Sequence, residues 1–206
     1  MVDDDQDEVK LVSIEDEGYP PLLREVVGAP VLLYVKGEVT TLSLPVMAVV
    51  GTRRMSREGE RKTEAVVKKI LSEGMGVVSG LAYGVDAKAH QVCLEEGGKT
   101  VAVMAHGLDM VYPEKNKGLA EKIIESGGVL ASELPLGVGP ERYYFPMRNR
   151  LIVGMSLGLV VVECEENSGS MTSVNHAAEM GRTVFAVPGS PGTDLLLAEG
   201  VNEMMI

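Results

Sequence analysis

Two adjacent arginines follow a short apolar run near residue 50, where they are well positioned to bind an anion. Residues 46–50 (VMAVV) are too few for a buried helix and are typical of a strand covered on both faces. A helix is expected to begin at Arg57 with Ser56 as its N-cap, and the turn before it contains Gly51, Thr52, Arg53, Arg54 and Ser56. A strand, a turn and a helix start leave free N–H groups pointing into the turn. The segment therefore predicts a phosphate-binding turn, and solvated surface charge is the alternative.

A second glycine-containing turn, SGLAYGVD, spans residues 79–86. Small residues such as Gly80 let a ligand approach the backbone, and Tyr83 lies beside them. Asp86 is expected to cap the following helix. A tight turn that only packs closely explains the pattern equally well. His90, four residues after Asp86, is expected to serve packing rather than catalysis.

A third stretch combines arginines, an amide and aromatic rings. Arginine forms forked contacts with phosphates, asparagine bonds to bases or phosphate oxygens, and aromatic rings provide faces on which bases can stack. The candidate side chains here are Arg142, Phe145, Arg148, Asn149 and Arg150. Tyr143 and Tyr144 lie in the same stretch, although tyrosine and phenylalanine also fill ordinary core gaps.

A fourth candidate is the SGS sequence of Ser168, Gly169 and Ser170, which precedes a predicted helix. Hydroxyls and free N–H groups at a helix start suit a phosphate, whereas a plain N-cap by Ser168 or Ser170 requires no ligand.

No catalytic set is recognisable in the sequence. GxSxG, HExxH and paired His/Cys metal spacings are missing, so we expect neither catalysis nor a cofactor. The acidic cluster of Glu163, Glu165 and Glu166 could hold a metal, but carboxylates at a strand end are more often solvated. Cys93 and Cys164 lie in apolar patterns and are read as reduced core thiols, which favours a cytoplasmic protein.

Composition and charge fit a globular protein with a local binding site. The 206 residues are 45% hydrophobic, enough for one core, and neither a membrane-spanning run nor a secretory signal is recognisable. The net charge is −11, but residues 1–17 contribute −7 of it, so they are predicted to be a solvated acidic lead before a single domain at 18–206. The nearly balanced remainder leaves room for a local basic cleft.

Strands alternate with helices along the rest of the chain, which predicts an α/β fold with a doubly wound, mostly parallel sheet. Strands are expected at 31–35, 46–50, 75–79, 100–104, 129–131, 159–162 and 183–187. Helices are expected at 57–73, 87–96, 117–126, through 148–156, at 168–180 and near the end. In such a sheet ligands bind outside the carboxyl ends of the strands, where all four candidate segments would lie.

Taken together, the motifs resemble those of the DprA/Smf family, the DNA-processing proteins of natural transformation. The matching stretches, which cover about residues 12–206, are YPPLL (19–23), VVGTRRMSREG (49–59), VSGLAYGVDAKAH (78–90), GLDMVYPEKN (107–116), ASELPLG (131–137), FPMRNRLIVGMS (145–156), SGSMTS (168–173) and GRTVFAVPGS (181–190).

The resemblance implies an extended Rossmann-like domain, with helices on both faces of the sheet, that binds single-stranded DNA with little sequence preference. It also implies a homodimer that hands the strand to the recombinase RecA. Carried over residue by residue, the DNA pocket would use Gly51 and Arg53 together with Arg142, Phe145, Arg148, Asn149 and Arg150. Gly80 and the SGS turn would line the same pocket.

The chain departs from the family pattern at several places. Tyr83 stands where many relatives carry a basic residue, and Thr172 and Ser173 replace an Ile-Thr pair. The segment after Gly189 is shorter than usual, and the helical and winged-helix domains that flank this fold in relatives are not expected here.

Two other functions remain open at this level. The stretch PGSPGT (188–193) is faintly similar to the PGGxGTxxE motif of phosphoribohydrolases on a related fold, but Leu196 stands where their glutamate would be needed. A small-nucleotide sensor would use the same phosphate turn without a long groove.

Overall fold

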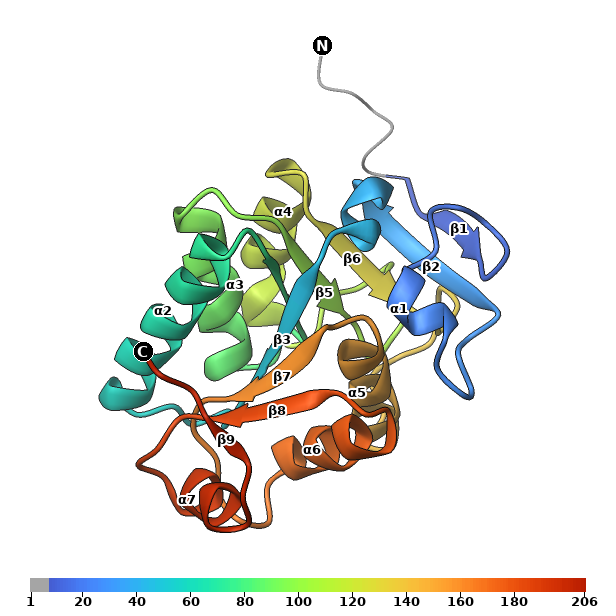
Figure 1. The fold of residues 1–206 in the computed structure, drawn as a ribbon. Coiled ribbons are helices and arrows are strands. Elements are labelled where there is room, and N and C mark those ends of the chain that lie inside the picture. Colours follow the sequence, from blue (N-terminus) through green and yellow to red (C-terminus); the bar gives the residue numbers. More distant parts are fainter. Residues whose placement is uncertain (1–7) are drawn as a thin grey trace.

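A single sheet forms the centre of the computed structural model, which describes residues 8–206 (Figure 1). Nine strands of these residues lie side by side in the order β1-β2-β6-β5-β4-β3-β7-β8-β9. The bounds are β1 Lys10–Ser13, β2 Leu32–Gly37, β3 Val46–Val50, β4 Gly76–Ser79, β5 Thr100–Val103, β6 Val129–Ser132, β7 Gly158–Val161, β8 Thr183–Ala186 and β9 Asn202–Glu203. Strand β2 is antiparallel to both β1 and β6, and the other neighbouring strands are parallel. The mostly parallel, doubly wound sheet predicted from the sequence is confirmed.

Helices cover both faces of this sheet (Figure 1). Their bounds are α1 Pro21–Arg24, α2 Arg57–Ser72, α3 Val85–Glu95, α4 Lys117–Glu125, α5 Tyr144–Gly154, α6 Gly169–Glu179 and α7 Pro191–Ala198, with short 3-10 turns at Val39–Ser43 and Glu114–Asn116. Helices α2, α3 and α4 pack in succession on one face, and α5 packs against α1 and α6 on the other. The fold is therefore a three-layered, Rossmann-like α/β arrangement.

The central strand shows how the sequence produces these layers. Every residue of β3 is buried. Because side chains alternate across a strand, Val46, Ala48 and Val50 join the core beneath α5 and α6, whereas Met47 and Val49 join the core beneath α2 and α3. An uninterrupted apolar run is thus what a strand covered on both faces requires.

The acidic lead predicted for residues 1–17 is wrong for part of its length. Residues 10–13 form β1, which is antiparallel to β2, with Lys10 opposite Val35. Val12 is buried in the core while Leu11 is 57% exposed, so β1 is an edge strand with one side chain facing inward. Two apolar residues give too little pattern to predict a strand from sequence. Residues 1–7 of the predicted lead lie outside the described residues.

Helix α5 begins at Tyr144, four residues before the start expected from the sequence. Pro146 lies in its first turn, where backbone N–H groups have no partner within the helix, so the missing N–H of proline costs nothing there. This early start brings the aromatic residues at the head of α5 to the carboxyl ends of the strands.

No helix among residues 8–206 combines the length and the apolar composition needed to cross a bilayer.

Candidate functional site

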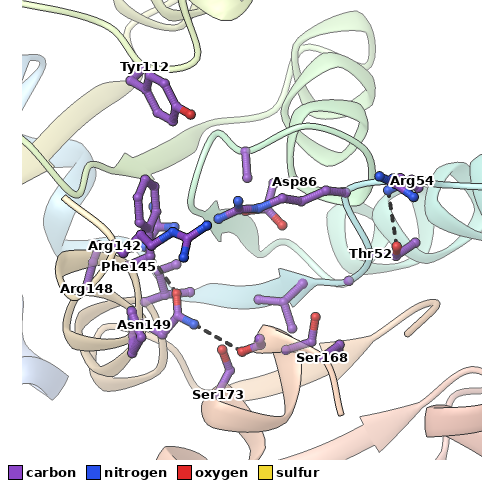
Figure 2. A pocket seen from close by; sticks show the side chains of 18 residues that line it. Thr52, Arg54, Asp86, Tyr112, Arg142, Phe145, Arg148, Asn149, Ser168 and Ser173 are labelled. Atoms are coloured by element: carbon purple, nitrogen blue, oxygen red, sulfur yellow. Dashed lines mark hydrogen bonds between the residues drawn. The ribbon is translucent and has the colours of Figure 1, made fainter. Parts of the chain in front are cut away.

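A cavity of about 750 Å³ lies at the carboxyl end of β3, between the turn after this strand and the first turns of α5 and α6 (Figure 2). Eleven of the residues singled out from the sequence line it: Gly51, Thr52, Arg53, Arg54, Arg142, Phe145, Arg148, Asn149, Ser168, Gly169 and Ser170. In Figure 2, Thr52 and Arg54 lie at one end, Arg142, Phe145 and Asn149 at the other, and Ser168 and Ser173 along one side. Segments far apart in the chain thus meet at one edge of the sheet.

The turn after β3 is held by backbone hydrogen bonds to its neighbours. The Thr52 N–H donates to the carbonyl of Glu163 (2.7 Å), and the Thr52 carbonyl accepts from the Val85 N–H (3.2 Å). A Cβ on Gly51 would lie 2.6 Å from Val85 Cγ2 and 2.8 Å from the Glu163 carbonyl oxygen, so only glycine fits here. The turn therefore fixes the backbone from which Arg53 and Arg54 project, and both arginines are exposed.

Arg53 lies over an aromatic ring. Its guanidinium carbon is 5.0 Å from the ring centroid of Phe145, a cation–π arrangement that fixes one face of the guanidinium. The N–H groups of a guanidinium lie in its plane, so they stay available to an anion in the cavity.

Ser56 has a structural role and does not line the cavity. Its hydroxyl accepts from the Gly59 N–H (2.9 Å), which confirms the predicted helix cap, and donates to Glu163 Oε2 (3.1 Å). The Glu163 carboxylate is thus used to hold the start of α2, while Glu165 and Glu166 are exposed. Among residues 8–206 no cluster of histidine, cysteine or acidic side chains has metal-ligand geometry.

Arg148 is buried and serves mainly to join strand ends. Its Nη1 donates to the carbonyls of Gly80 (2.7 Å) and Val103, and so ties α5 to the ends of β4 and β5. A Cβ on Gly80 would collide with the guanidinium of Arg148, which explains the glycine at this position. Burial lowers the pKa of Arg148 to about 10, opposed by the charge of Asp86.

Asp86 is the buried counter-charge of this arginine. Its carboxylate accepts from the Gly80 N–H (3.2 Å), and it lines the cavity. Burial raises its pKa, while the positive charge of Arg148 and the backbone hydrogen bonds act in the opposite direction. The expectation that Asp86 caps α3 is wrong: Gly84 occupies the N-cap with φ 75°, and Asp86 lies in the first turn and stabilises the preceding loop instead.

Gly80 and Tyr83 line a smaller cavity of about 50 Å³ next to the first. The two cavities share Arg53, Ala82, Tyr112 and Phe145. The turn that carries Gly80 and Tyr83 therefore borders both cavities, although these two residues line only the smaller one.

The residues at 148–150 do not all face the cavity. Successive residues of a helix point about 100° apart, so three in a row cannot share one face. Asn149 reaches the cavity, where its Nδ2 donates to the Gly169 carbonyl (3.4 Å). Arg150 instead pairs with Glu133 and donates to the Gly28 carbonyl (2.9 Å), outside both cavities. The expectation that Arg150 joins this pocket is not met.

The start of α6 supplies the second helix N-terminus of the site. Ser168 is the N-cap residue, but its side chain makes no capping hydrogen bond, unlike a plain N-cap. Ser173, one turn further on, is buried and lines the cavity with a hydroxyl that has no hydrogen-bond partner. The free N–H groups of the first turn and this hydroxyl suit an anion.

Sequence reasoning left three polar lining residues out of the site, namely Tyr112, Asp86 and Ser173. Tyr112 is 48% exposed, and its N–H donates to Nε2 of the buried His106 (3.1 Å). Its position in a loop after β5 was the available signal, because that loop was expected at the carboxyl edge of the sheet. Ser173 could be found only through helical periodicity from Ser170.

The fold and the cavity define a Rossmann-like α/β protein with a cationic, partly aromatic cavity at the carboxyl ends of its strands. The chain belongs to the DNA recombination-mediator protein A family, whose sequence model matches residues 10–205. It is 45% identical to DNA processing protein DprA of Streptococcus pneumoniae over 178 residues, which are 86% of this chain and 62% of that protein. It is 41% identical to protein Smf of Escherichia coli, over 89% of this chain and 50% of that protein. The chain thus spans half to three-fifths of the length of these two relatives.

Solved structures agree with this assignment. The X-ray structure of the S. pneumoniae DprA matches with a TM-score of 0.89 and 39% identity, over 97% of this chain and 72% of that one. DNA processing protein A of Helicobacter pylori, described for its single-stranded DNA binding mode, matches with a TM-score of 0.84 and 28% identity, over 94% of this chain and 90% of that one. A molybdenum cofactor binding protein of Rippkaea orientalis, at 15% identity and a TM-score of 0.57 over 79% of this chain and 90% of that one, shares the fold alone.

Proposed function

We propose that this chain binds single-stranded DNA without sequence preference, in the cavity at the carboxyl end of β3. The observation that carries the proposal is the meeting of Arg53, Arg54 and Arg142 with the start of α6 around one cavity. Arginines and helix N-termini both bind phosphates, and contacts with phosphates carry no information about the bases. The related H. pylori protein, described as binding single-stranded DNA, supports the proposal.

We further propose that the protein acts in DNA uptake and natural transformation by loading a RecA-type recombinase onto incoming strands. It would do so as a cytoplasmic homodimer, by binding rather than catalysis and without a cofactor. The family description as a recombination mediator and the DNA-processing names of the relatives support this role. Dimerisation and recombinase contact can each be measured directly, by sedimentation and by recombinase loading on a coated strand.

The residues would divide the work of binding among them. The three exposed arginines would hold backbone phosphates through charge-assisted hydrogen bonds, and the first turn of α6 would hold another through its N–H groups. Phe145 would keep Arg53 in place and offer a ring to a base. Arg148, with both hydrogen-bonded carbonyls buried, would position the turn after β4 rather than touch phosphate.

Replacing Arg53 by alanine tests this proposal. We expect Arg53→Ala to weaken binding of a twelve-base oligo-dT by roughly 10- to 150-fold at moderate salt, because a charge-assisted contact is worth about 1.5–3 kcal/mol. The loss should be similar for other sequences, and duplex DNA should bind more weakly than single strands. Fluorescence anisotropy with labelled strands measures all three.

Arg61→Ala is the matched control. Arg61 lies near the start of α2, the helix that follows the turn with Arg53. It pairs with Glu58 on the surface and lines neither cavity. Arg61→Ala should bind oligo-dT with an affinity within about twofold of the unaltered protein, because exposed ion pairs contribute little to stability. Equal affinity of Arg53→Ala and the unaltered protein for oligo-dT would contradict the pocket assignment.

The two alternative functions receive less support. The PGSPGT loop lies outside the residues that line the cavities, where Ser190 and Thr193 form the capping box of α7, and Leu196 is buried in the core. Release of base from nucleoside monophosphates would nevertheless favour a phosphoribohydrolase. Comparable affinity for a mononucleotide and for a twelve-base strand would favour a nucleotide sensor.

A further inference from the structure

A pair of tyrosine rings lies beside the main cavity without lining it. Tyr143 and Tyr144 have ring centroids 4.1 Å apart and planes tilted by 45°. Tyr144 is partly buried, whereas Tyr143 is 58% exposed, more than any other tyrosine of residues 8–206. Neither ring belongs to the lining of the two cavities. The binding proposed for the cavity therefore leaves both rings unused.

The tyrosine pair belongs to an exposed apolar surface at the head of α5. Met147 lies one helical turn after Tyr143 and is 44% exposed. Pro146, which is also exposed, lies between them and lines the main cavity. Arg142, which directly precedes the pair, lines the cavity as well. The exposed rings are thus continuous with the rim of the cavity.

The backbone beneath the pair is held by the start of the helix. Tyr143 is the N-cap residue of α5 and already has helical dihedral angles, φ −75° and ψ −19°. The Tyr144 N–H donates to the Glu141 carbonyl (3.0 Å), and the proline ring of Pro146 restricts the first turn. Because Tyr144 contacts one side of the Tyr143 ring, the exposed part of that ring faces away from its partner. A flat ligand therefore meets a preorganised aromatic surface, which lowers the entropic cost of binding.

The charges around the pair neither attract nor repel a strand strongly. Hydrogen bonding to the Tyr144 side chain is the main cause that raises the pKa of Tyr143 above its ordinary value near 10, so this phenol is neutral at physiological pH. The exposed side chains of Glu141 and Arg142 precede the pair and carry opposite charges. A ligand at this surface is consequently held by the rings rather than by net charge.

A single strand that occupies the cavity has to continue beyond it. Twelve bases span about 40 Å even at the base spacing of a duplex, far more than a cavity of about 750 Å³ contains. On the α6 side the exposed carboxylates of Glu165 and Glu166 precede Ser168 and disfavour phosphates. At the end of the cavity where Arg142 lies, the strand meets the exposed rings instead (Figure 2).

We infer that the Tyr143–Tyr144 pair is a nucleobase platform outside the cavity, on which one base of the strand stacks where the strand leaves the cavity past Arg142. The inference rests on the proposed binding of single-stranded DNA and adds one nucleotide to the site that the cavity provides. Tyr143 contacts the base, and Tyr144 is a positioning residue that supports its ring. Every base has a π-face, so the platform accepts any sequence.

Photo-crosslinking tests the location of the base. Twelve-base strands that carry 5-iododeoxyuridine at one position each are bound to the unaltered protein and irradiated. The halogenated base reacts with an aromatic ring on which it stacks, so we expect at least one of these strands to form a crosslink to Tyr143. Mass spectrometry of the digested complex identifies the crosslinked residue.

Affinity measurements test whether stacking at this ring contributes to binding. Tyr143→Ala should weaken binding of a twelve-base oligo-dT by roughly 5- to 20-fold, the lower part of the range for one stacked base, because the platform is open to water. Tyr143→Phe keeps the ring and should retain the affinity, whereas Tyr143→Leu keeps apolar bulk without a flat ring and should resemble Tyr143→Ala. A strand of twelve abasic phosphodiester units should bind all of these proteins within about twofold. Fluorescence anisotropy measures each affinity.

Two further variants separate support of the ring from general surface effects. Tyr144→Ala should weaken oligo-dT binding less than Tyr143→Ala, and the double variant should lose no more than Tyr143→Ala alone, because Tyr144 acts only through Tyr143. Leu44→Ala is the matched control, since Leu44 is 42% exposed and precedes β3, at the edge of the sheet opposite the cavity. Its affinity for oligo-dT should be unchanged. Thermal unfolding of each variant verifies that the fold is intact.

Two results would overturn the platform while leaving strand binding in the cavity intact. One is an equal loss on oligo-dT and on the abasic strand in Tyr143→Ala. The other is an unchanged oligo-dT affinity of this variant, which would make the exposed rings a contact for another protein instead. Failure of the unaltered protein to bind oligo-dT at all would overturn the proposed function and the platform together.

Discussion

At the scale of single residues, His90 shows how burial suppresses ionisation near the site. The side chain is fully buried on α3. The Thr100 hydroxyl donates to the Val77 carbonyl (2.9 Å), so it accepts a hydrogen from His90 Nδ1 (2.7 Å). Nε2 is then unprotonated and has no partner. Burial, with the charge of Arg148 as a smaller cause, lowers the pKa of His90 to about 3.

This histidine predicts a specific acid sensitivity. The pKa of His90 is near 6.5 in the unfolded chain and about 3 in the folded protein. Between these two pH values the histidine is protonated in the unfolded chain but neutral in the folded protein. The free energy of unfolding therefore falls as the pH falls through this window. We expect His90 to contribute a loss of about 2 kcal/mol between pH 6 and pH 4.5. Urea unfolding at a series of pH values measures it.

His90→Asn isolates the contribution, because the asparagine amide can donate to Thr100 without titrating. Its stability at pH 7 will differ from that of the unaltered protein, but its slope against pH over this window should be shallower. Parallel stability curves for the two proteins would contradict the assignment of acid sensitivity to His90.

The arginines of the site show what sequence can and cannot predict at this scale. Arg53, Arg148 and Arg150 look alike as candidates, and their motifs place all three near the strand ends. In the structure Arg53 lies in the cavity, Arg148 bonds buried carbonyls, and Arg150 pairs with Glu133. These roles depend on helix phase and on acceptors supplied by distant segments, neither of which the local sequence specifies.

At the scale of elements, the turn after β4 depends on a glycine that leaves room for an arginine. Because a Cβ on Gly80 would collide with the Arg148 guanidinium, Gly80→Ala must displace either the turn or the head of α5. We expect a destabilisation of about 1–3 kcal/mol, typical of overpacking a tight interior. Affinity for single strands should also fall, since the same turn carries Tyr83. Urea unfolding and anisotropy measure the two effects.

Gly118→Ala serves as the control for this substitution. Gly118 lies in α4 with open space around its Cβ position, and alanine is the better helix former. The variant should be as stable as the unaltered protein or more stable by up to about 1 kcal/mol. If Gly80→Ala were equally harmless, the role assigned to the Gly80–Arg148 contact would be wrong.

The elements themselves were largely predictable from the sequence. The runs 46–50 and 100–104 and the periodic segment 57–73 correspond closely to β3, β5 and α2, because long apolar or amphipathic patterns reflect burial directly. The two edge strands were not predicted. Strand β1 has a single inward side chain and β9 is two residues long, so their existence depends on the neighbouring strand rather than on their own pattern.

At the scale of the whole molecule, the net negative charge disfavours binding of a polyanion, whereas the arginines of the cavity favour it. The chain carries a net charge of −11, yet three exposed arginines line one cavity. Charges farther away than a Debye length, about 10 Å at 0.1 M salt, are largely screened. At moderate salt a polyanion at the cavity therefore interacts mainly with the nearby arginines. The acidic surface repels it appreciably only at low salt.

This balance predicts the salt dependence of strand binding. Releasing counterions from about three phosphates gives a slope of log affinity against log salt near −2, or a loss of roughly 20-fold between 50 and 200 mM salt. Below about 20 mM the curve should flatten, because repulsion from the acidic surface grows as screening weakens. Anisotropy titrations of a twelve-base oligo-dT from 10 to 300 mM salt measure both regions.

Arg53→Ala should reduce the slope by about 0.7, the contribution of one phosphate contact to single strands. A slope much steeper than −3, unchanged in this variant, would mean that the strand lies on a wider basic surface than the cavity provides.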